Sequence, residues 1–479
     1  MTKQNLIAGT WRGSGDSAPD INPSDLTDVV DTFAVADVAD ARAAVAAAAQ
    51  AFPAWSSTTP QARFSILDTA GGEILRRAAE LGDLLAREEG KTRAEATGEV
   101  TRAGQIFKFH AGQALRITGE YVQSVRPGVD VTVSREPVGV VTVITPWNFP
   151  LAIPAWKIAP ALAYGNTVVF KPAELVPGCA WALTDILLRA GVPAGVLNLV
   201  MGRGSVIGDV ITGSAEVSAV SFTGSTETGR HVLKQAQDHG ARVQLEMGGK
   251  NPLIVVDDAD LGTAVDAAVE GAFGSTGQRC TASSRIIVTA GIYDRFTAAL
   301  AERVRAIRVG DARHPDTQMG PVVDQAQLAQ DEHYLSVARA DGAEVVGGHR
   351  VKAAADGFYL APALVLNSQP ADVINRDEVF GPVASVLRVG DYDEALAAAN
   401  DTKFGLTAGI VTTSLAKAGH FRRHSTAGMV MVNLPTAGVD YHVPFGGRKA
   451  SSYGPREQGE HAREFYTVSK TAYVASGTP

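Results

Sequence analysis

The feature that most constrains the fold is a regular alternation between short runs of β-branched, apolar residues and longer Ala- and Leu-rich stretches. The short runs include VGVVTVIT (138–145), TVVF (167–170), VLNLV (196–200), AVSF (219–222), PLIVV (252–256), RIIV (285–288) and ASVLRV (384–389). The stretches between them, at 177–191, 204–213, 227–239, 260–273 and 291–308, have the length and composition of helices. This alternation predicts βαβ units with buried parallel strands, whose carboxyl ends carry ligands in open α/β sheets.

Length, charge and cysteine content exclude several classes of protein. The chain has 479 residues, more than a single hydrophobic core usually holds, so two or more domains are expected. Its formal net charge of -8 disfavours nucleic acid and anionic membranes as partners, and no run of about 18 apolar residues predicts a membrane span. The N-terminal segment lacks the apolar core of a signal peptide. The two cysteines, Cys179 and Cys280, suggest neither a disulfide framework nor a metal site, which favours a reducing, cytoplasmic compartment.

Two segments outside this alternation have distinct patterns. The stretch 37–51 is Ala-rich and predicts a helix capped by Asp37. The segment 118–137 alternates polar and β-branched residues around a Pro-Gly turn and predicts an exposed hairpin. Because an exposed strand edge needs cover, we expect a partner subunit to contact this hairpin.

Cys280 lies in the segment STGQRCTASSR, between a helical stretch and the strand at 285–288. A lone cysteine is often a small buried hydrophobe, and that alternative fits Cys179, which has an apolar helical context. Around Cys280, the Gly, Ser and Thr residues predict an approachable loop. The neighbouring Arg279 is expected to lower the pKa of the thiol and so favour the nucleophilic thiolate.

Glu246 and Asn148 follow other predicted strands. Glu246, in VQLEMGGKNP, lies between a strand-like run and a Gly pair, where an apolar cleft can raise a carboxyl pKa into the range of a general base. Asn148 lies in VITPWNFPLAIPAWK, in a rigid loop between two prolines, and its amide is a donor suited to a developing oxyanion. The alternatives are a solvated or ion-paired glutamate and an ordinary turn asparagine.

Two more strand ends have features of nucleotide binding. Gly224 and Gly229 frame the run SFTGSTETGR, in which a strand meets a helix, so backbone N–H groups can bind a phosphate although the spacing is not GxGxxG. Lys171 and Glu174, in VVFKPAELVP, also follow a strand and can bind ribose hydroxyls. The alternative for that pair is a surface ion pair at the start of a helix.

Taken together, these segments resemble a known family. PWNFP, FKPAE, FTGSTETG, LEMGGKNP, GQRC, EVFGPV and PFGGRK occur in this order across the chain. Their order and spacing resemble those of the aldehyde dehydrogenase superfamily over essentially all 479 residues. The resemblance implies an enzyme that oxidises an aldehyde to a carboxylic acid with NAD or NADP. NAD is favoured, because the carboxylate of Glu174 suits a free 2′-hydroxyl better than a 2′-phosphate.

The resemblance also implies roles for single residues. The implied catalytic residues are Cys280 as nucleophile, Glu246 as base, Asn148 as oxyanion donor together with the backbone N–H of Cys280, and Lys171. The implied cofactor contacts are Trp147, Lys171, Glu174, Gly224, Ser225, Glu378 and Phe380. Candidates for contact with the substrate are Arg102, Phe149, Trp156 and Arg279, and no metal is expected. The reaction would pass through a thiohemiacetal and a thioester on the cysteine.

The domain organisation follows from the same resemblance. It implies an α/β fold with a Rossmann-like cofactor domain (1–117 and 138–248) and an α/β catalytic domain (249–448). A small β element for bridging and oligomerisation would comprise 118–137 and 449–479, with a strand near 466–476 joining the hairpin. Members of the family are usually dimers or tetramers, so a homo-oligomer is expected.

Two segments indicate which aldehyde is used. SSYGPREQG and EVTRAGQIFKFHAGQALR resemble the dehydrogenases of α-ketoglutaric semialdehyde (2,5-dioxopentanoate). In a helix around 99–111, Arg102, Ile106 and Phe109 share one face, and an arginine on an apolar face needs a partner. Arg102 is therefore expected to bind a substrate carboxylate, with Arg279 as a second candidate. The alternative is an ion pair between Arg102 and a protein carboxylate.

Other functions remain as alternatives. The substrate could be another semialdehyde or an aliphatic or aromatic aldehyde. A CoA-acylating enzyme would keep Cys280 but transfer the acyl group to CoA, whereas Glu246 in its LEMGGK setting argues for hydrolysis. A non-enzymatic protein on this scaffold should have lost Cys280 or Glu246, and both are present.

Overall fold

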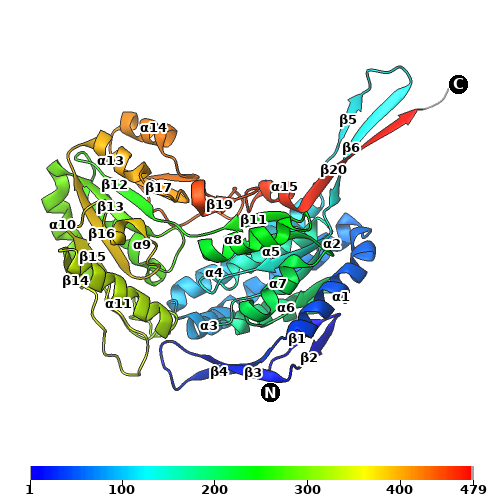
Figure 1. Cartoon of the computed structure of the whole chain (residues 1–479), viewed down its shortest axis with the longest axis horizontal. Coiled ribbons are helices and arrows are strands. Elements are labelled where there is room, and N and C mark those ends of the chain that lie inside the picture. The colour runs from blue at the N-terminus through cyan, green and yellow to red at the C-terminus, as the bar shows by residue number, and fades with distance from the viewer. Residues whose placement is uncertain (1, 476–479) are drawn as a thin grey trace.

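The computed structural model describes residues 2–475 and contains two large, mainly parallel sheets, each with helices on both faces (Figure 1). The eight-stranded sheet has the order β19-β11-β10-β7-β8-β9-β1-β2, and the seven-stranded sheet has the order β14-β15-β16-β13-β12-β17-β18. A three-stranded sheet, β20-β6-β5, and the hairpin of β3 (Asp16–Ile21) with β4 (Val29–Val35) complete the strands. The predicted α/β fold class is confirmed.

The first sheet has a parallel centre and antiparallel edges. Its parallel strands are β7 (Val140–Ile144), β8 (Thr167–Lys171), β9 (Leu197–Leu199), β10 (Val217–Thr223) and β11 (Arg242–Glu246). Its antiparallel edge strands are β1 (Asn5–Ile7), β2 (Thr10–Arg12) and β19 (Ser452–Tyr453). The helices on one face are α1 (Val38–Ser56), α7 (Gly204–Gly213) and α8 (Thr226–Gln237). Those on the other are α2 (Pro60–Arg76), α3 (Ala78–Glu89), α4 (Arg93–Ala114), α5 (Ala152–Ala163) and α6 (Pro177–Arg189).

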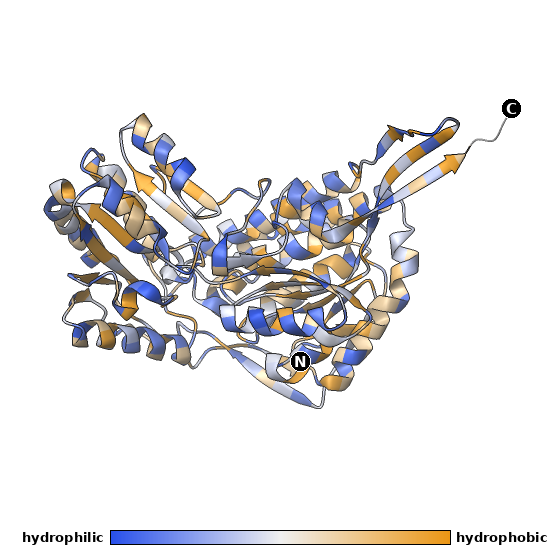
Figure 2. Cartoon of the chain, turned by 45° about the horizontal axis from the view of Figure 1, so that its top comes forward, coloured by the Kyte–Doolittle hydropathy of each residue, from blue (hydrophilic) through white to orange (hydrophobic). Residues whose placement is uncertain are grey.

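The residues of β7 show why the sequences of these strands are continuously apolar and do not alternate with polar residues. Val141 and Val143 pack in the hydrophobic cluster beneath α2 to α6, whereas Val140 packs in the cluster beneath α1, α7 and α8. Both faces are therefore buried, as parallel sheets require. Figure 2 shows these apolar strands inside a layer of mixed helices.

The second sheet is built in the same way. Its parallel strands are β12 (Asn251–Val255), β13 (Ser283–Thr289), β15 (Ala363–Leu366), β16 (Val383–Val389), β17 (Thr407–Val411) and β18 (Met429–Val432), with β14 (Glu344–Gly347) antiparallel at one edge. The helices packed on its two faces include α9 (Leu261–Phe273), α10 (Ala290–Arg305), α11 (Gln325–Ala340), α13 (Tyr392–Asn400) and α14 (Leu415–His424).

The helix predicted at 37–51 begins as expected and ends later. Asp37 caps α1 by accepting a hydrogen bond from the N–H of Asp40 at 2.9 Å. The helix continues past residue 51 to Ser56. Among residues 2–475, no helix is both long and apolar enough to cross a membrane.

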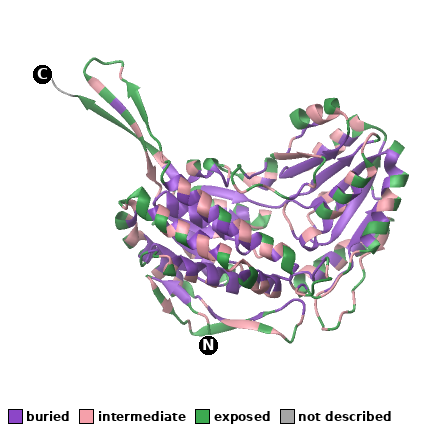
Figure 3. Cartoon of the chain, turned by 180° about the vertical axis from the view of Figure 1, so that it is seen from behind, coloured by how far each residue is buried: buried purple, intermediate pink, exposed green. Residues whose placement is uncertain are grey.

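The hairpin predicted at 118–137 is confirmed. It consists of β5 (Glu120–Gln123) and β6 (Val129–Pro137), and β20 (Thr467–Ala475) pairs antiparallel along the whole length of β6. The three strands form an arm that extends from the body (Figure 1), and most of its residues are exposed (Figure 3). Residues 476–479, which the sequence assigns to this element, lie outside the described residues.

The carboxyl ends of the first sheet face the amino ends of the second. β11 ends at Glu246, and β12 begins only five positions later at Asn251. The loop after β7 contains Asn148, whose side chain contacts the segment just before β13. Side chains from both sheets therefore meet at this boundary, where ligands of open α/β sheets usually bind.

Candidate active site

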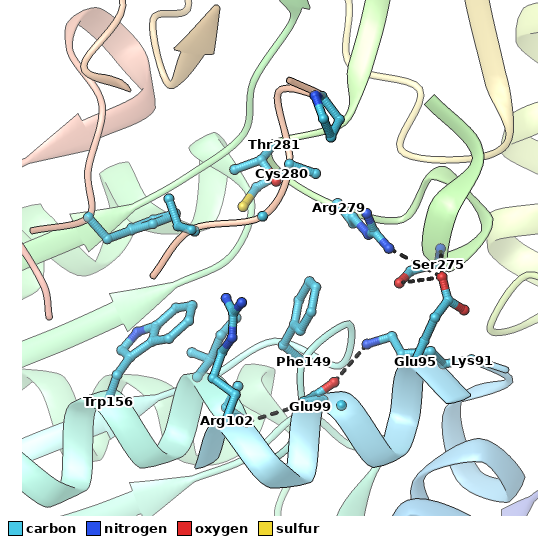
Figure 4. A pocket seen from close by; sticks show the side chains of 18 of the residues that line it. Lys91, Glu95, Glu99, Arg102, Phe149, Trp156, Ser275, Arg279, Cys280 and Thr281 are labelled. Carbon is cyan, nitrogen blue, oxygen red and sulfur yellow. Dashed lines mark hydrogen bonds and ion pairs between the residues drawn. The ribbon is translucent and has the colours of Figure 1, made fainter. Parts of the chain in front are cut away.

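Two cavities lie at the boundary between the sheets, and both are lined by Cys280 and Ile153. The first has a volume of about 340 Å³, and its charged and aromatic lining residues are Lys91, Glu95, Glu99, Arg102, Phe149, Trp156, Glu270, Arg279 and Phe445 (Figure 4). The second has a volume of about 320 Å³, and the predicted residues that line it include Trp147, Asn148, Gly224, Ser225, Glu378 and Phe380. The four predicted substrate contacts thus line the first cavity, and five of the seven predicted cofactor contacts line the second.

Cys280 follows a short helix, η1 (Gly274–Gly277), in a loop with unusual backbone conformations. Ser275 and Thr276 have positive φ values of 49° and 57°, which are uncommon for residues with a side chain. Asn251, at the start of β12, donates from Nδ2 to the carbonyl oxygen of Cys280 at 2.8 Å. The cysteine is partly exposed where the cavities meet. An aldehyde and a cofactor can therefore reach its Sγ from different sides.

The expectation that Arg279 lowers the pKa of the Cys280 thiol is wrong. The Arg279 guanidinium pairs with Glu95 at 3.2 Å and with Glu270 at 3.3 Å. Burial raises the pKa of the thiol, and the carboxylates of Glu378 and Glu246 raise it further. Adjacent residues in a loop can direct their side chains to different partners. Arg279 is next to Cys280 in the sequence, but its charge is paired with the two glutamates and not with the thiol. The thiol therefore needs a nearby base or cation in order to ionise.

Asn148 is buried in the loop after β7. Its Nδ2 donates to the carbonyl oxygen of Gln278 at 2.9 Å, two residues before Cys280. A side-chain amide has two N–H donors, so the second can serve a ligand in the cavity that Asn148 and Cys280 both line. The arrangement suits an oxyanion that forms on a carbon bonded to Sγ.

Glu246 is buried at the end of β11, but within the described chain it lines neither cavity. Ser452 of β19 donates from Oγ to Glu246 Oε2 at 2.5 Å. Burial raises the pKa of the Glu246 carboxyl well above its ordinary range, and the nearby Glu457 raises it further. Glu246 also acts electrostatically on the Cys280 thiol. A carboxylate whose pKa is raised in this way is a stronger base than an ordinary glutamate.

Behind Glu246 lies a buried ion pair that the sequence analysis missed. Lys157 of α5 pairs with Glu457, and Lys157 Nζ also donates to Ser221 Oγ at 2.9 Å. Glu457 belongs to the SSYGPREQG stretch, which we had related only to the choice of substrate. A signal was present, because a lysine inside an apolar helix requires an acidic partner.

Lys171 and Glu174 lie beyond the second cavity, at the end of β8. Burial lowers the pKa of Lys171, whose Nζ donates to the carbonyl oxygen of Pro172 at 2.8 Å. Glu174 is exposed, and its Oε1 accepts from the N–H of Gly204 at 2.9 Å at the start of α7. In the described chain the two form no ion pair with each other, so the surface-pair alternative does not hold. Both side chains remain suited to hydroxyl groups of a ribose.

An aromatic pair and a carboxylate shape the second cavity. The rings of Trp147 and Phe380 meet edge to face with centroids 5.4 Å apart. Glu378 accepts from the N–H of Gly249 at 2.7 Å, and burial raises its pKa to about 7. A Cβ at Gly248 would lie only 2.0 Å from Glu378 Oε2, so a side chain at position 248 would displace this carboxylate.

Gly224, Ser225 and Gly229 form the junction between β10 and α8. Ser225 caps α8 by accepting from the N–H of Thr228 at 3.2 Å. A Cβ at Gly229 would lie 2.5 Å from the Sδ atom of Met247, so this glycine lets α8 approach the end of β11 closely. The N–H groups and positive dipole end at a helix N-terminus suit a phosphate. Together with the aromatic pair and Glu378, these residues fit a dinucleotide cofactor.

Arg102 lines the first cavity through a different face of α4 from the one expected. Ile106 is buried in the core, and Phe109 packs edge to face against Tyr441 at 6.1 Å, so the Arg102–Ile106–Phe109 face is not the cavity wall. The residues of α4 that line the cavity are Glu95, Gly98, Glu99 and Arg102. They are spaced i, i+3, i+4 and i+7, so this polar stripe was visible in the sequence.

The sequence itself matches a known family. Residues 11–472 match the sequence profile of the Aldehyde dehydrogenase family. The chain therefore belongs to the aldehyde dehydrogenase family, and it is an oxidoreductase that acts on small aldehydes. The family and the enzyme class predicted from the ordered motifs are confirmed.

Individual relatives are similar over nearly the full chain. The alpha-ketoglutarate semialdehyde dehydrogenase of Haloferax volcanii is 43% identical over 476 residues, which are 98% of each chain. The 2,5-dioxopentanoate dehydrogenase of Saccharolobus solfataricus is 41% identical over 477 residues, which are 99% of each chain. A crystal structure of betaine aldehyde dehydrogenase from Staphylococcus aureus in complex with NAD+ has a TM-score of 0.97 and 36% identity, covering 100% of this chain and 96% of that one. Such neighbours support the predicted use of NAD(P).

Proposed function

We propose that this chain oxidises an aldehyde with a carboxylate at its far end, 2,5-dioxopentanoate, to the carboxylic acid 2-oxoglutarate. The observation that carries the proposal is the Arg102 guanidinium, which lines the same cavity as the Cys280 thiol. In Figure 4 the Arg102 side chain points from α4 into the space beneath Cys280. A substrate with an aldehyde at one end and a carboxylate at the other can engage both groups at once.

The other cations of this cavity already have protein partners. Lys91 pairs with Glu99 at 2.7 Å, and Arg279 pairs with two glutamates. Within residues 2–475, Arg102 forms no ion pair. Burial lowers the pKa of Arg102, and the carboxylates of Glu99 and Asp440 offset this only in part. A partly buried guanidinium without a counter-ion gains about 1.5–3 kcal/mol from a hydrogen-bonded carboxylate.

The walls of the cavity and the relatives support the same substrate. Trp156 stacks on Phe445 with centroids 5.5 Å apart, and with Phe149 they offer apolar surface for a short methylene chain. Two of the relatives are named for α-ketoglutaric semialdehyde and 2,5-dioxopentanoate, which are the same compound. Betaine aldehyde, the substrate named for the Staphylococcus aureus neighbour, is a cation and would be repelled by Arg102.

The proposed chemistry assigns a step to each residue. Glu246 removes the proton of Cys280, whose Sγ adds to the aldehyde carbon. The free N–H of Asn148 and the backbone N–H of Cys280 donate to the resulting oxyanion, and one such donor contributes about 3–4 kcal/mol. When bound, NAD(P)+ accepts a hydride from that carbon, which leaves the acyl group on Sγ. Glu246 passes the proton of Cys280 to solvent and then takes a proton from the water that attacks the thioester. Collapse of this adduct releases the acid, and the proton on Glu246 returns to the Cys280 thiolate.

For the cofactor, we propose NAD+ in preference to NADP+. Lys171 and Glu174 would hold the adenosine ribose, and the junction after β10 would hold the pyrophosphate. Glu378 would bind the nicotinamide ribose, with Trp147 and Phe380 beside the ring. A 2′-phosphate would place further negative charge next to Glu174, which disfavours NADP+.

The domains, assembly and compartment are also proposals. The separate sheets support a cofactor domain (1–117 and 138–248), a catalytic domain (249–448) and a bridging element (118–137 and 449–479). Exposed Tyr121, Val125 and Tyr473 on the arm support a homo-oligomer, a dimer or a tetramer. A nucleophilic thiol works only when reduced, which supports a cytoplasmic location.

The experiment is a substrate series with the wild-type enzyme, followed by NAD(P)H absorbance and without added CoA. It compares 2,5-dioxopentanoate, succinic and glutaric semialdehydes, the neutral aldehyde pentanal and the cationic betaine aldehyde. We expect the acidic aldehydes to have the highest kcat/KM and betaine aldehyde the lowest. A neutral or cationic aldehyde as the best substrate would overturn the proposed substrate class, and a strict need for CoA would overturn hydrolysis.

A further inference from the structure

Lys91 and Glu99 form a buried ion pair beneath the loop that contains Asn148. Their Nζ and Oε2 atoms are 2.7 Å apart, and the two side chains are only 1% and 2% exposed. Lys91 lies in the connection between α3 and α4, after Gly90 with φ of 91° and before Thr92, which caps α4. Figure 4 shows the pair at the floor of the first cavity.

Lys91 holds the first half of the loop. Its Nζ donates to the backbone carbonyl of Asn148 at 2.8 Å. The same Nζ lies 3.8 Å from the centroid of the Phe149 ring, at the distance of a cation–π contact. One ammonium group therefore contacts the backbone of Asn148, the ring of its neighbour and the carboxylate of Glu99.

Glu99 holds the second half with its other oxygen. Oε1 accepts from the N–H of Leu151 at 2.9 Å and from the N–H of Ala152 at 3.1 Å. These amides begin α5, whose capping position, Leu151, has no side chain able to accept a hydrogen bond. Glu99 supplies from α4 the acceptor that α5 lacks. The segment 148–152 is therefore attached at both ends to one ion pair.

The charges of the pair are set by its surroundings. Burial alone would lower the pKa of Lys91, but the nearby glutamates, Glu99 first among them, raise it. Burial raises the pKa of Glu89 to about 8, so this neighbour is mainly protonated at neutral pH. Lys91 is therefore an ammonium group whose ion partner is Glu99.

We propose that the Lys91–Glu99 pair is a positioning device that fixes Asn148 relative to Cys280, and that it acts on the rate through Asn148 alone. The inference rests on the role of Asn148 as oxyanion donor in the proposed function. An oxyanion donor is effective only within a few tenths of an ångström of its place. In the described chain, the other hydrogen bond of Asn148 runs from its own Nδ2 to the carbonyl oxygen of Gln278.

A contribution to folding stability does not by itself explain the buried Lys91–Glu99 pair. A buried ion pair usually contributes little more than well-packed apolar residues of the same volume, because removing both charges from water is costly. Removing one partner alone leaves an uncompensated buried charge. The informative variant therefore neutralises both residues, as in Lys91→Met/Glu99→Gln, where the glutamine keeps an acceptor for the amides of Leu151 and Ala152.

The control is a more exposed lysine–carboxylate pair that also involves α4. Lys108 of α4 pairs with Asp68 of α2 at 2.7 Å, and neither lines a cavity in the described chain. We expect Lys91→Met/Glu99→Gln to lower kcat/KM by about 10–100-fold, the effect of a misplacement of about 1 Å, with an unchanged Kd for NAD+. We expect Lys108→Met/Asp68→Asn to retain kcat/KM within about 2-fold.

The test that separates positioning from architecture is a double-mutant cycle with Asn148→Ala, and Glu99→Gln alone serves as the milder variant if the double variant does not fold. If the pair acts through Asn148, neutralising it in the Asn148→Ala enzyme lowers kcat/KM by less than about 3-fold. The same loss in both backgrounds overturns the inference while leaving the role of Asn148 intact. An Asn148→Ala enzyme with full activity overturns the proposed oxyanion role and the inference with it.

Discussion

The two cavities that meet at Cys280 are built by different means. The first takes seven of its lining residues from α4 and α5 and most of the others from loops, and six of its lining residues are charged. The second is lined largely by residues that follow β7, β10 and β11, and only Glu378 among its lining residues is charged. The second cavity, built mainly at strand ends, binds a ligand that does not vary. The selectivity of the first cavity for its substrate depends instead on which of its charged side chains lack a protein partner. Recognition of cofactor and recognition of substrate are therefore separable, although the two cavities meet at Cys280 and Ile153.

The largest effect is expected at Cys280, the proposed nucleophile, which lines both cavities. Cys280→Ala should lower turnover by about 10⁴-fold or more, because no covalent bond to the substrate can form. NAD+ should still bind, as measured by fluorescence titration, since the other lining residues of the second cavity remain. The control is Cys179→Ala in the core of α6, which should retain nearly full turnover. Loss of activity in the Cys179 variant with survival of the Cys280 variant would contradict the assignment.

Glu246, which lines neither cavity, should affect only proton transfer. Glu246→Gln should lower steady-state turnover by about 10²–10⁴-fold. A pre-steady-state burst of NADH should remain if another base can deprotonate Cys280, and it should disappear if Glu246 serves both steps.

The pH profile adds a second measure of Glu246. Its carboxyl pKa is raised mainly by burial, and a base acts when deprotonated, so kcat should rise with pH above the ordinary titration range of a carboxyl group. The rising limb should be absent from Glu246→Gln. The same limb in both enzymes would mean that another group titrates.

Arg102 belongs to the first cavity alone, so its effect should depend on the substrate. Arg102→Met should lower kcat/KM for 2,5-dioxopentanoate by about 10–150-fold, the equivalent of a charged hydrogen bond. It should change kcat/KM for pentanal little, and the Kd for NAD+ should be unchanged. Thermal unfolding shows whether the variant is folded. Equal losses on both aldehydes in a folded variant would mean that Arg102 is structural.

The smallest effect is expected at Glu174, which would bind the adenosine ribose of the cofactor. Glu174→Gln should reduce the preference for NAD+ over NADP+ by about 5–10-fold, because the repulsion of a 2′-phosphate is lost while a hydrogen-bond acceptor remains. Ratios of kcat/KM with the two cofactors measure this directly. A wild-type enzyme that prefers NADP+ would refute the proposal before any substitution is made.

The sequence identified lining residues of both cavities, but not the pairing of charges within the first. Gly224 follows a strand that was visible as an apolar run, so its place at the sheet edge followed from the topology of a parallel sheet, whereas Trp147 and Glu378 were assigned to the cofactor only through the family resemblance. The strands of the second sheet were visible as apolar runs, and the hairpin at 118–137 was visible as alternating polar and β-branched residues around a Pro-Gly turn. Residues that follow a parallel strand in the sequence therefore lie at the edge of the sheet in the structure.

The first cavity depends on pairings that no local pattern contains. Lys91 and Glu99 are eight positions apart across a helix cap, and Arg279 pairs with Glu95 from 184 positions away. Which cation remains without a partner is decided only when α4 packs against the loops before β13 and after β7. For this reason the sequence identified Arg102 but assigned it to the wrong face of α4 and assigned the wrong effect to Arg279.

The pairing of β20 with β6 determines when the arm can form during synthesis of the chain. Arg135 and Thr467, which contact each other across these strands, are 332 positions apart. At about 5–20 residues per second, β6 leaves the ribosome roughly 15–70 seconds before its partner is made. During this interval one edge of β6 has no strand beside it, and unpaired edges promote aggregation. Charged side chains on a strand edge oppose pairing with other chains, and β6 carries two of them, Arg135 and Glu136.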